Sequence, residues 1–290
     1  MFDKREELAS IMPKDSTVER LETGFRFTEG PLWNGSQRFL LFSDIPANRI
    51  YKWSPEEGLG MFRDPSGNSN GLTYDKNGRL LICEHSNRRL SRIEKDGAYT
   101  VLADSFRGKR LNSPNDVIVR SDGAIYFTDP PYGTQPKEKE LPFQGVYHVD
   151  PEDSKLTLLV DDFDRPNGLA FSPDESILYI GDSSTARRHV RAFDVTRDGT
   201  VSNGRVFAEI SSELPGNPDG IKVDTEGHLY VSAAGGIWVF SQDREHLGTV
   251  RTPEIPANCA WGDSDWRTLF ITARTSIYRV KTGVQGVSTP

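Results

Sequence analysis

The chain has 290 residues, and its 42 Asp and Glu outnumber its 35 Lys and Arg, which gives a formal net charge of −7 at pH 7. Because it carries that charge and no Lys/Arg-rich run, we expect no nucleic-acid partner. Its two cysteines, Cys83 and Cys259, exclude a disulfide framework and offer no zinc-ligand spacing.

The first segment, MFDKREELASIMPKDS, is highly charged. It lacks the apolar core of roughly 7–15 residues that a signal peptide needs. No later run approaches the roughly 20 apolar residues of a membrane helix. We therefore expect a cytoplasmic protein with no membrane partner, and we treat residues 1–15 as an N-terminal extension.

Six windows of similar pattern then follow along the chain. Each consists of a short apolar strand, a polar turn and a second, more hydrophobic strand, and further strand-like pieces follow each window. The windows are EGPLWNGSQRFLLFSD from Glu29, NGLTYDKNGRLLICE from Asn70, NDVIVRSDGAIYFTD from Asn115, NGLAFSPDESILYIGD from Asn167, DGIKVDTEGHLYVSA from Asp219 and NCAWGDSDWRTLFITA from Asn258.

A repeat of roughly 40–50 residues with four short strands is typical of a β-propeller blade. Six of them predict an all-β fold, a six-bladed β-propeller with four-stranded blades, as a single domain over residues 1–290. The sixth unit is short after SIYRVK, so we expect a strand from segment 16–27 to complete it and close the ring. The alternative is a β-sandwich or solenoid of unrelated hairpins.

Tryptophan side chains recur at strand positions, and we expect them to fill space between blades. They are Trp33, Trp53, Trp238, Trp261 and Trp266.

The residue that begins each window always carries an oxygen in its side chain. In an up-and-down blade the start of the first strand and the end of the second lie at one end of the channel, so these head residues should ring its mouth. Residues just after the second strands should lie above that end. The head residues are Glu29, Asn70, Asn115, Asn167, Asp219 and Asn258.

Each head residue alone also fits a turn former, because Asn and Asp before Gly favour turns. Glu29 does not fit that interpretation, and six such residues in one channel favour a cation site. Carboxylate and amide oxygens suit a hard cation, so we expect Ca²⁺ first, Mg²⁺ or Mn²⁺ next, with Zn²⁺ as a further option. Glu29 and Asp219 together would neutralise a divalent ion.

The segments FTEGPLW, LNSPNDVIVRSDGAIYFTDPPYG, RPNGLAFSPDESILYIGDS and NPDGIKVDTEGHLYVSAAGGIWVF resemble the gluconolactonase branch of the SMP-30/gluconolactonase/luciferin-regenerating-enzyme family. The resemblance runs from about residue 25 to 285. It implies a six-bladed propeller with one divalent metal in the channel, which hydrolyses lactones. Its metal ligands would be Glu29, Asn115, Asn167 and Asp219, and Asp219 would also be catalytic.

One position departs from the family. The animal branch of the family has a sugar-contacting Arg two residues before the third head residue, where this chain has Ser113, so the substrate contacts of that branch do not transfer. As candidates for substrate binding we take Asn112, Tyr132 and Asn70. Tyr132 begins an irregular insertion that extends to about Phe143.

His85 is the one histidine expected above the channel, and we take it as a second catalytic candidate that orients substrate or moves a proton near neutral pH. The other interpretation is a loop histidine bonded to backbone.

The expected reaction is the opening of a small-molecule sugar-acid lactone. The metal would polarise the carbonyl, and Asp219 would activate water or attack directly. The alternatives are a lactonase or phosphotriesterase of other specificity and a propeller that only binds a ligand. The oligomeric state stays open.

Overall fold

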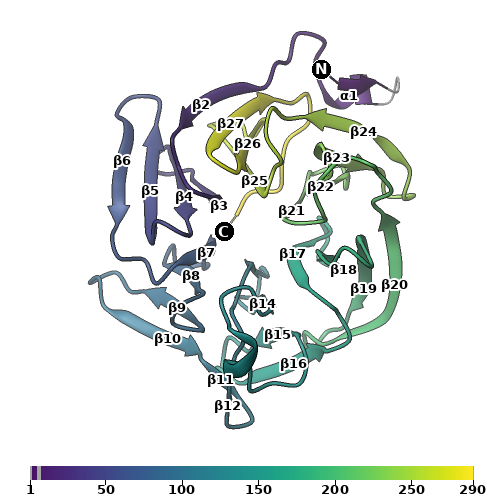
Figure 1. Ribbon diagram of the computed structural model, residues 1–290. Helices are drawn as coiled ribbons and strands as arrows, with labels where there is room; N and C mark the ends of the chain where they lie inside the picture. Colours follow the sequence, from purple (N-terminus) through teal and green to yellow (C-terminus); the bar gives the residue numbers. More distant parts are fainter. Residues whose placement is uncertain (1, 5–7, 290) are drawn as a thin grey trace.

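The computed structural model describes residues 2–4 and 8–289, and it is nearly all β-sheet. Six sheets are arranged around a central axis as the blades of a propeller (Figure 1). The prediction of a six-bladed propeller with four-stranded blades is confirmed. Within the described residues, no helix combines the length and apolar character needed to cross a membrane.

The blades follow chain order. Blade 1 consists of β3 (Thr28–Asn34), β4 (Phe39–Asp44), β5 (Arg49–Ser54) and β6 (Gly58–Arg63). Blade 2 consists of β7 (Ser69–Tyr74), β8 (Leu80–Glu84), β9 (Arg89–Ile93) and β10 (Tyr99–Ala103). Blade 3 consists of β13 (Val117–Val119), β14 (Ile125–Asp129), β15 (Gly145–Val149) and β16 (Leu156–Val160). Blade 4 consists of β17 (Pro166–Phe171), β18 (Ile177–Asp182), β19 (His189–Val195) and β20 (Val201–Glu209). Blade 5 consists of β21 (Ile221–Val223), β22 (Leu229–Ala233), β23 (Gly236–Phe240) and β24 (His246–Arg251). Blade 6 consists of β25 (Asn258–Gly262), β26 (Thr268–Ala273) and β27 (Ser276–Lys281) with β2 (Glu19–Thr23).

The N-terminal strand closes the ring, as predicted. β2 pairs antiparallel with β27, with Glu19 opposite Arg279 and Thr23 opposite Ser276. Blade 6 therefore combines the two ends of the propeller, with β2 as its outer strand.

The segment before β2 adds two elements that the sequence did not predict. β1 (Phe2–Lys4) pairs with β24 and extends blade 5 to five strands. The short helix α1 (Leu8–Ile11) buries Leu8 and Ile11 against the core of blades 5 and 6. A small hairpin, β11 (Ser105–Phe106) with β12 (Lys109–Arg110), also lies outside the blades.

The second strand of each window is more hydrophobic than the first because neighbouring blades cover both of its faces. All residues of β4, β8, β14, β22 and β26 are buried. The outer strand β6 has four of its six residues exposed. Burial on two faces requires near-continuous apolar side chains, whereas an outer strand tolerates polar ones.

Tryptophans pack between blades in part as predicted. Trp33 of blade 1 stacks on Phe270 of blade 6, with ring centroids 5.0 Å apart. Trp266 is different, because it lies in the turn between β25 and β26 with a φ of 54° rather than on a strand.

Candidate active site

The six head residues lie at one end of the channel, and each blade is bonded there to the next. Five of them are no more than 3% exposed, and Asp219 is less deeply buried. At each contact between neighbouring blades one hydrogen bond links the two, so the links continue around the whole ring. These bonds are Ser43 Oγ to Asn70 O (2.9 Å), Gly71 N to Asn115 O (2.8 Å), Thr128 Oγ1 to Asn167 O (2.9 Å), Gly168 N to Asp219 O (3.2 Å), Gly220 N to Ala257 O (2.8 Å) and Asn258 Nδ2 to Glu29 Oε2 (3.1 Å).

Glycine follows four of the head residues because successive blades approach closely there. A Cβ at Gly30 would lie 2.0 Å from Asn70 O, and one at Gly168 would lie 2.2 Å from Asp219 O. Of the four glycines, Gly30 alone has a positive φ, 53°. The pairs Asn70-Gly71 and Asn167-Gly168 lie in strands β7 and β17, so in both of them glycine serves close packing rather than a turn.

The third window has Asp116 where these four windows have glycine, and its carboxylate joins the site. Asn258 Nδ2 donates to Glu29 Oε2 at 3.1 Å and to Asp116 Oδ2 at 3.3 Å, so one amide links blades 1, 3 and 6. Sequence reasoning missed Asp116. The only available signal was the replacement of glycine by aspartate directly after a head residue.

Two carboxyl groups at this end of the channel have raised pKa values. Burial and the charge of Asp116 raise the pKa of Glu29 to about 7. Burial and the charges of Glu29 and Asp116 raise the pKa of Asp219 well above its usual range. The ionised forms of Glu29 and Asp219 are thus disfavoured, and a bound cation would relieve this.

The donor set fits a hard cation. Asn167 Oδ1 and Asp219 Oδ1 are buried without a hydrogen-bond partner among the described residues, and such atoms are rare unless a ligand completes them. No group of three His, Cys, Asp or Glu side chains in the described chain could hold a metal by itself. Amide oxygens from Asn115 and Asn167 would therefore have to join Glu29 and Asp219.

His85 lies beside the site and bonds to a head residue. Asn70 Nδ2 lies 3.2 Å from His85 Nε2, so the amide donates and Nε2 accepts. Burial lowers the pKa of His85 to about 4. The imidazole is therefore neutral and only weakly basic near pH 7.

The insertion that begins at Pro130 crosses the rim of this end. Tyr132 is 40% exposed, and Arg165 lies over its ring at 5.5 Å. Burial and the charge of Asp219 raise the pKa of its phenol, and Ser183 and Asn167 interact with the hydroxyl. Tyr132 thus reaches from the insertion toward blade 4 and the head residues.

Ser113 and Asn112 hold this insertion in place. Gly133 N donates to Ser113 Oγ at 2.9 Å, so the serine at the departure from the family pattern anchors the loop. Asn112 is fully buried, and its Nδ2 donates to Asp129 O and Phe143 O, both at 3.0 Å. With its amide donors engaged, Asn112 positions the loop and offers no free donor to a substrate.

The aspartates that end the second strands of blades 1, 3 and 4 brace the same end of the channel. Each accepts two backbone N–H groups from the residues that precede a head residue. The pairs are Asp44 with Arg26 and Phe27, Asp129 with Asn112 and Ser113, and Asp182 with Asp164 and Arg165, at 2.7–3.1 Å.

Comparison with known proteins places the chain among lactonases. The family model described as SMP-30/Gluconolactonase/LRE-like region matches residues 27–275. The chain is 34% identical to a gluconolactonase of Zymomonas mobilis, over 96% of this chain and 85% of that protein. It is 28% identical to a pentonolactonase of Haloferax volcanii, over 88% and 84%.

Among solved structures, a gluconolactonase from Xanthomonas campestris superposes with a TM-score of 0.88, at 36% identity over 96% of this chain and 93% of that one. The calcium-binding protein regucalcin from Agrobacterium tumefaciens has a TM-score of 0.79 over 94% of this chain and 96% of that one. Its 20% identity makes that a likeness of fold.

Proposed function

This chain belongs to the SMP-30/gluconolactonase/LRE-like family, and we propose that it is a divalent-metal-dependent hydrolase that opens a sugar-acid lactone. The observation that carries the proposal is the gathering of Glu29, Asp116 and Asp219 at one end of the channel, together with the buried, unpartnered oxygen of Asn167. The gluconolactonase and pentonolactonase relatives support the substrate class.

We assign the metal to Glu29, Asn115, Asn167 and Asp219. The unpartnered oxygens of Asn167 and Asp219 support that assignment. Ca²⁺ is the first candidate because the set is oxygen-only. When bound, such an ion supplies Lewis acidity that polarises the lactone carbonyl.

In the proposed reaction Asp219 takes a proton from the attacking water while the water oxygen bonds to the carbonyl carbon. The bond between that carbon and the ring oxygen then breaks, and the leaving oxygen takes up the proton. A cation bound to Asp219 would lower the pKa of this carboxylate, so Asp219 would act as a modest base whose position next to the water carries the effect. Direct attack by this carboxylate is the alternative route.

We propose orienting roles for the neighbouring groups. His85 stays neutral and holds the Asn70 amide through the 3.2 Å contact. Tyr132 and Arg165 form the outer wall, where an aromatic face and a cation suit the apolar face and the oxygens of a sugar acid.

The test is hydrolysis of D-glucono-δ-lactone, followed by pH change, on EDTA-stripped protein with and without Ca²⁺, Mg²⁺, Mn²⁺ or Zn²⁺. We expect metal-restored turnover above the spontaneous rate. Asp219→Asn should lower turnover by about 10²–10⁴-fold while the ion still binds, whereas the exposed Asp243→Asn should leave it unchanged.

Normal turnover by Asp219→Asn would refute the assigned role of Asp219. Tight ion binding without turnover of any lactone would instead indicate a phosphotriester substrate or a propeller that only binds.

A further inference from the structure

A cavity of about 400 Å³ lies at the other end of the central channel, which we call the far cavity. Its wall consists mostly of the distal halves of the first strands, the turns that follow them and the C-terminal segment 287–289, which ends at the centre of the ring (Figure 1). Apolar side chains dominate it, including Trp33, Leu72, Val117, Phe171, Trp261 and Trp266. Size and lining are those of a site for a small, largely apolar molecule.

One cation stands in this apolar wall. Lys222 lies on β21, and its Nζ donates to Ile221 O at 3.0 Å and to Asn258 Oδ1 at 3.4 Å. Across the described chain, no carboxylate lies within ion-pair distance of Lys222. An ammonium group has three N–H donors, so one N–H of Lys222 has no acceptor among the described residues.

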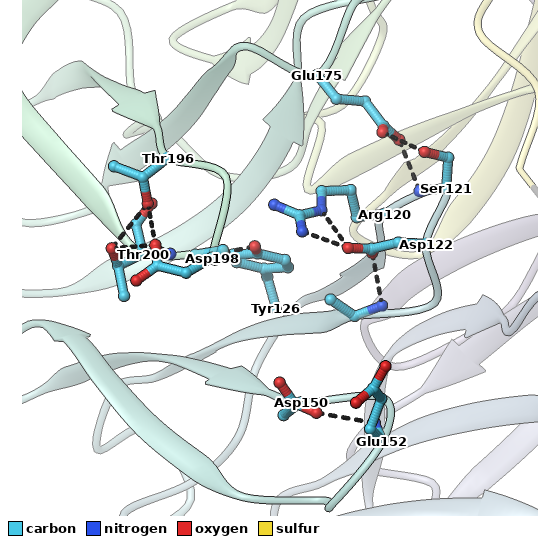
Figure 2. A network of polar contacts seen from close by, with 12 residues as sticks. Arg120, Ser121, Asp122, Tyr126, Asp150, Glu152, Glu175, Thr196, Asp198 and Thr200 are labelled. Atoms are coloured by element: carbon cyan, nitrogen blue, oxygen red, sulfur yellow. Dashed lines mark hydrogen bonds and ion pairs between the residues drawn. The ribbon is translucent and has the colours of Figure 1, made fainter.

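The carboxylate at the rim of the far cavity is held by its own partners. Glu175 accepts hydrogen bonds from Ser121 N at 2.8 Å and Ser121 Oγ at 2.5 Å, and it reaches across from blade 4 to the blade 3 turn (Figure 2). In the same view, Arg120 pairs with Asp122. Glu175 therefore braces two blades and does not pair with Lys222.

From this juxtaposition we propose that the far cavity binds a small monocarboxylate with an apolar body. The carboxylate accepts the remaining N–H of Lys222, and the hydrocarbon part packs against Trp266 and Phe171, the partly exposed aromatic rings of the wall. A charged amine beside apolar walls favours this ligand class. The amine pairs with one carboxylate, and a second charged group would be buried against apolar walls without a partner. The site adjoins one head residue, Asn258, through Lys222 Nζ, but it contains none of the residues assigned to the metal and does not depend on lactonase activity.

Octanoate is the probe, with 1-octanol as its uncharged counterpart. Binding is measured by tryptophan fluorescence, since three of the five tryptophans line the far cavity. The titration is run in EDTA, which removes any ion at the head residues that could itself attract a carboxylate. We expect octanoate to bind more tightly than 1-octanol.

Lys222→Met should weaken octanoate binding by roughly 10- to 100-fold, the value of a hydrogen bond to a charged group, and leave 1-octanol unchanged. The exposed Lys155→Met is the matched control and should bind octanoate like the unaltered chain. Equal binding of octanoate and 1-octanol, or no binding of either, would overturn the proposal.

A second measurement avoids any variant that fails to fold. Acetylation of amines in the unaltered protein is followed at Lys222 by mass spectrometry, with and without octanoate. We expect octanoate to slow acetylation of Lys222 and not of Lys155. Equal modification rates at Lys222 would contradict the proposal.

Discussion

At the scale of single residues, the side chain of Asn258 contacts both the carboxylates of the candidate active site and the lysine of the far cavity. Its Nδ2 donates to Glu29 and Asp116 on one side, and its Oδ1 accepts from Lys222 on the other. An amide is suited to this place because it offers donors to carboxylates and an acceptor to an amine at the same time. A carboxylate at position 258 would add a fourth acid to the site.

His85 gives a pH prediction at this scale. Burial lowers its pKa from 6.5 to about 4, so the unfolded chain takes up the proton first as the pH falls. The free energy of unfolding therefore decreases between pH 6.5 and pH 4, by about 2–3 kcal/mol at pH 4.5 from this residue alone. His85→Gln should remove that loss, as measured by urea denaturation at pH 7 and pH 4.5.

His228 provides a control of opposite sign. The hydrogen bond from its Nδ1 to Asp224 raises its pKa above 6.5. The stability that this contact adds is fully present below pH 6.5 and is lost as the pH rises through the folded pKa. His228→Gln should thus make the acid-induced loss larger, and equal slopes for the two variants would contradict the assignment.

At the scale of elements, the first strands are held at their closest approach by glycine. Gly168→Ala on β17 would place a Cβ 2.2 Å from Asp219 O, and backbone cannot move aside easily. We expect a loss of about 3 kcal/mol in the free energy of unfolding and lower lactonase activity, since Asp219 would be displaced. Gly60→Ala on the outer strand β6 is the control, because its nearest contact is 3.9 Å.

Gly60→Ala should be neutral or stabilise by up to about 1 kcal/mol, since alanine is more restricted in the unfolded chain. Denaturant titration of both variants separates crowding from the general effect of replacing a strand glycine. Equal stability of the two would show that the blades can move apart at their heads.

The blades were predictable because their inner strands must be apolar, whereas several finer features leave no such pattern. Asp116 was missed because an Asp after an Asn fits a turn as well as a channel wall. β1 was missed because Phe2–Lys4 is too short to show a period and pairs only with distant β24. The His85 ring and the Asn70 amide were both predicted near the channel, but their contact depends on packing that no spacing reveals.

At the scale of the whole molecule, the proposed ion should stabilise the ring as well as the reaction. Its four assigned ligands, Glu29, Asn115, Asn167 and Asp219, come from blades 1, 3, 4 and 5. An ion that binds only the folded chain adds about 2.7 kcal/mol to the free energy of unfolding at 100 times its Kd. For a chain of this length that corresponds to a rise in Tm of about 4 °C.

The measurement is the Tm at pH 8 in EDTA and then in excess Ca²⁺. At that pH Glu29, with a pKa of about 7, is largely deprotonated, so protons do not compete strongly for it. Glu29→Gln should reduce the rise in Tm without abolishing it, because it removes one of the two charges that neutralise the ion and leaves Asp219 in place, and Asp243→Asn should retain the full rise. If Glu29→Gln shows the full rise, the ion binds elsewhere and the blades are not tied together through the head residues.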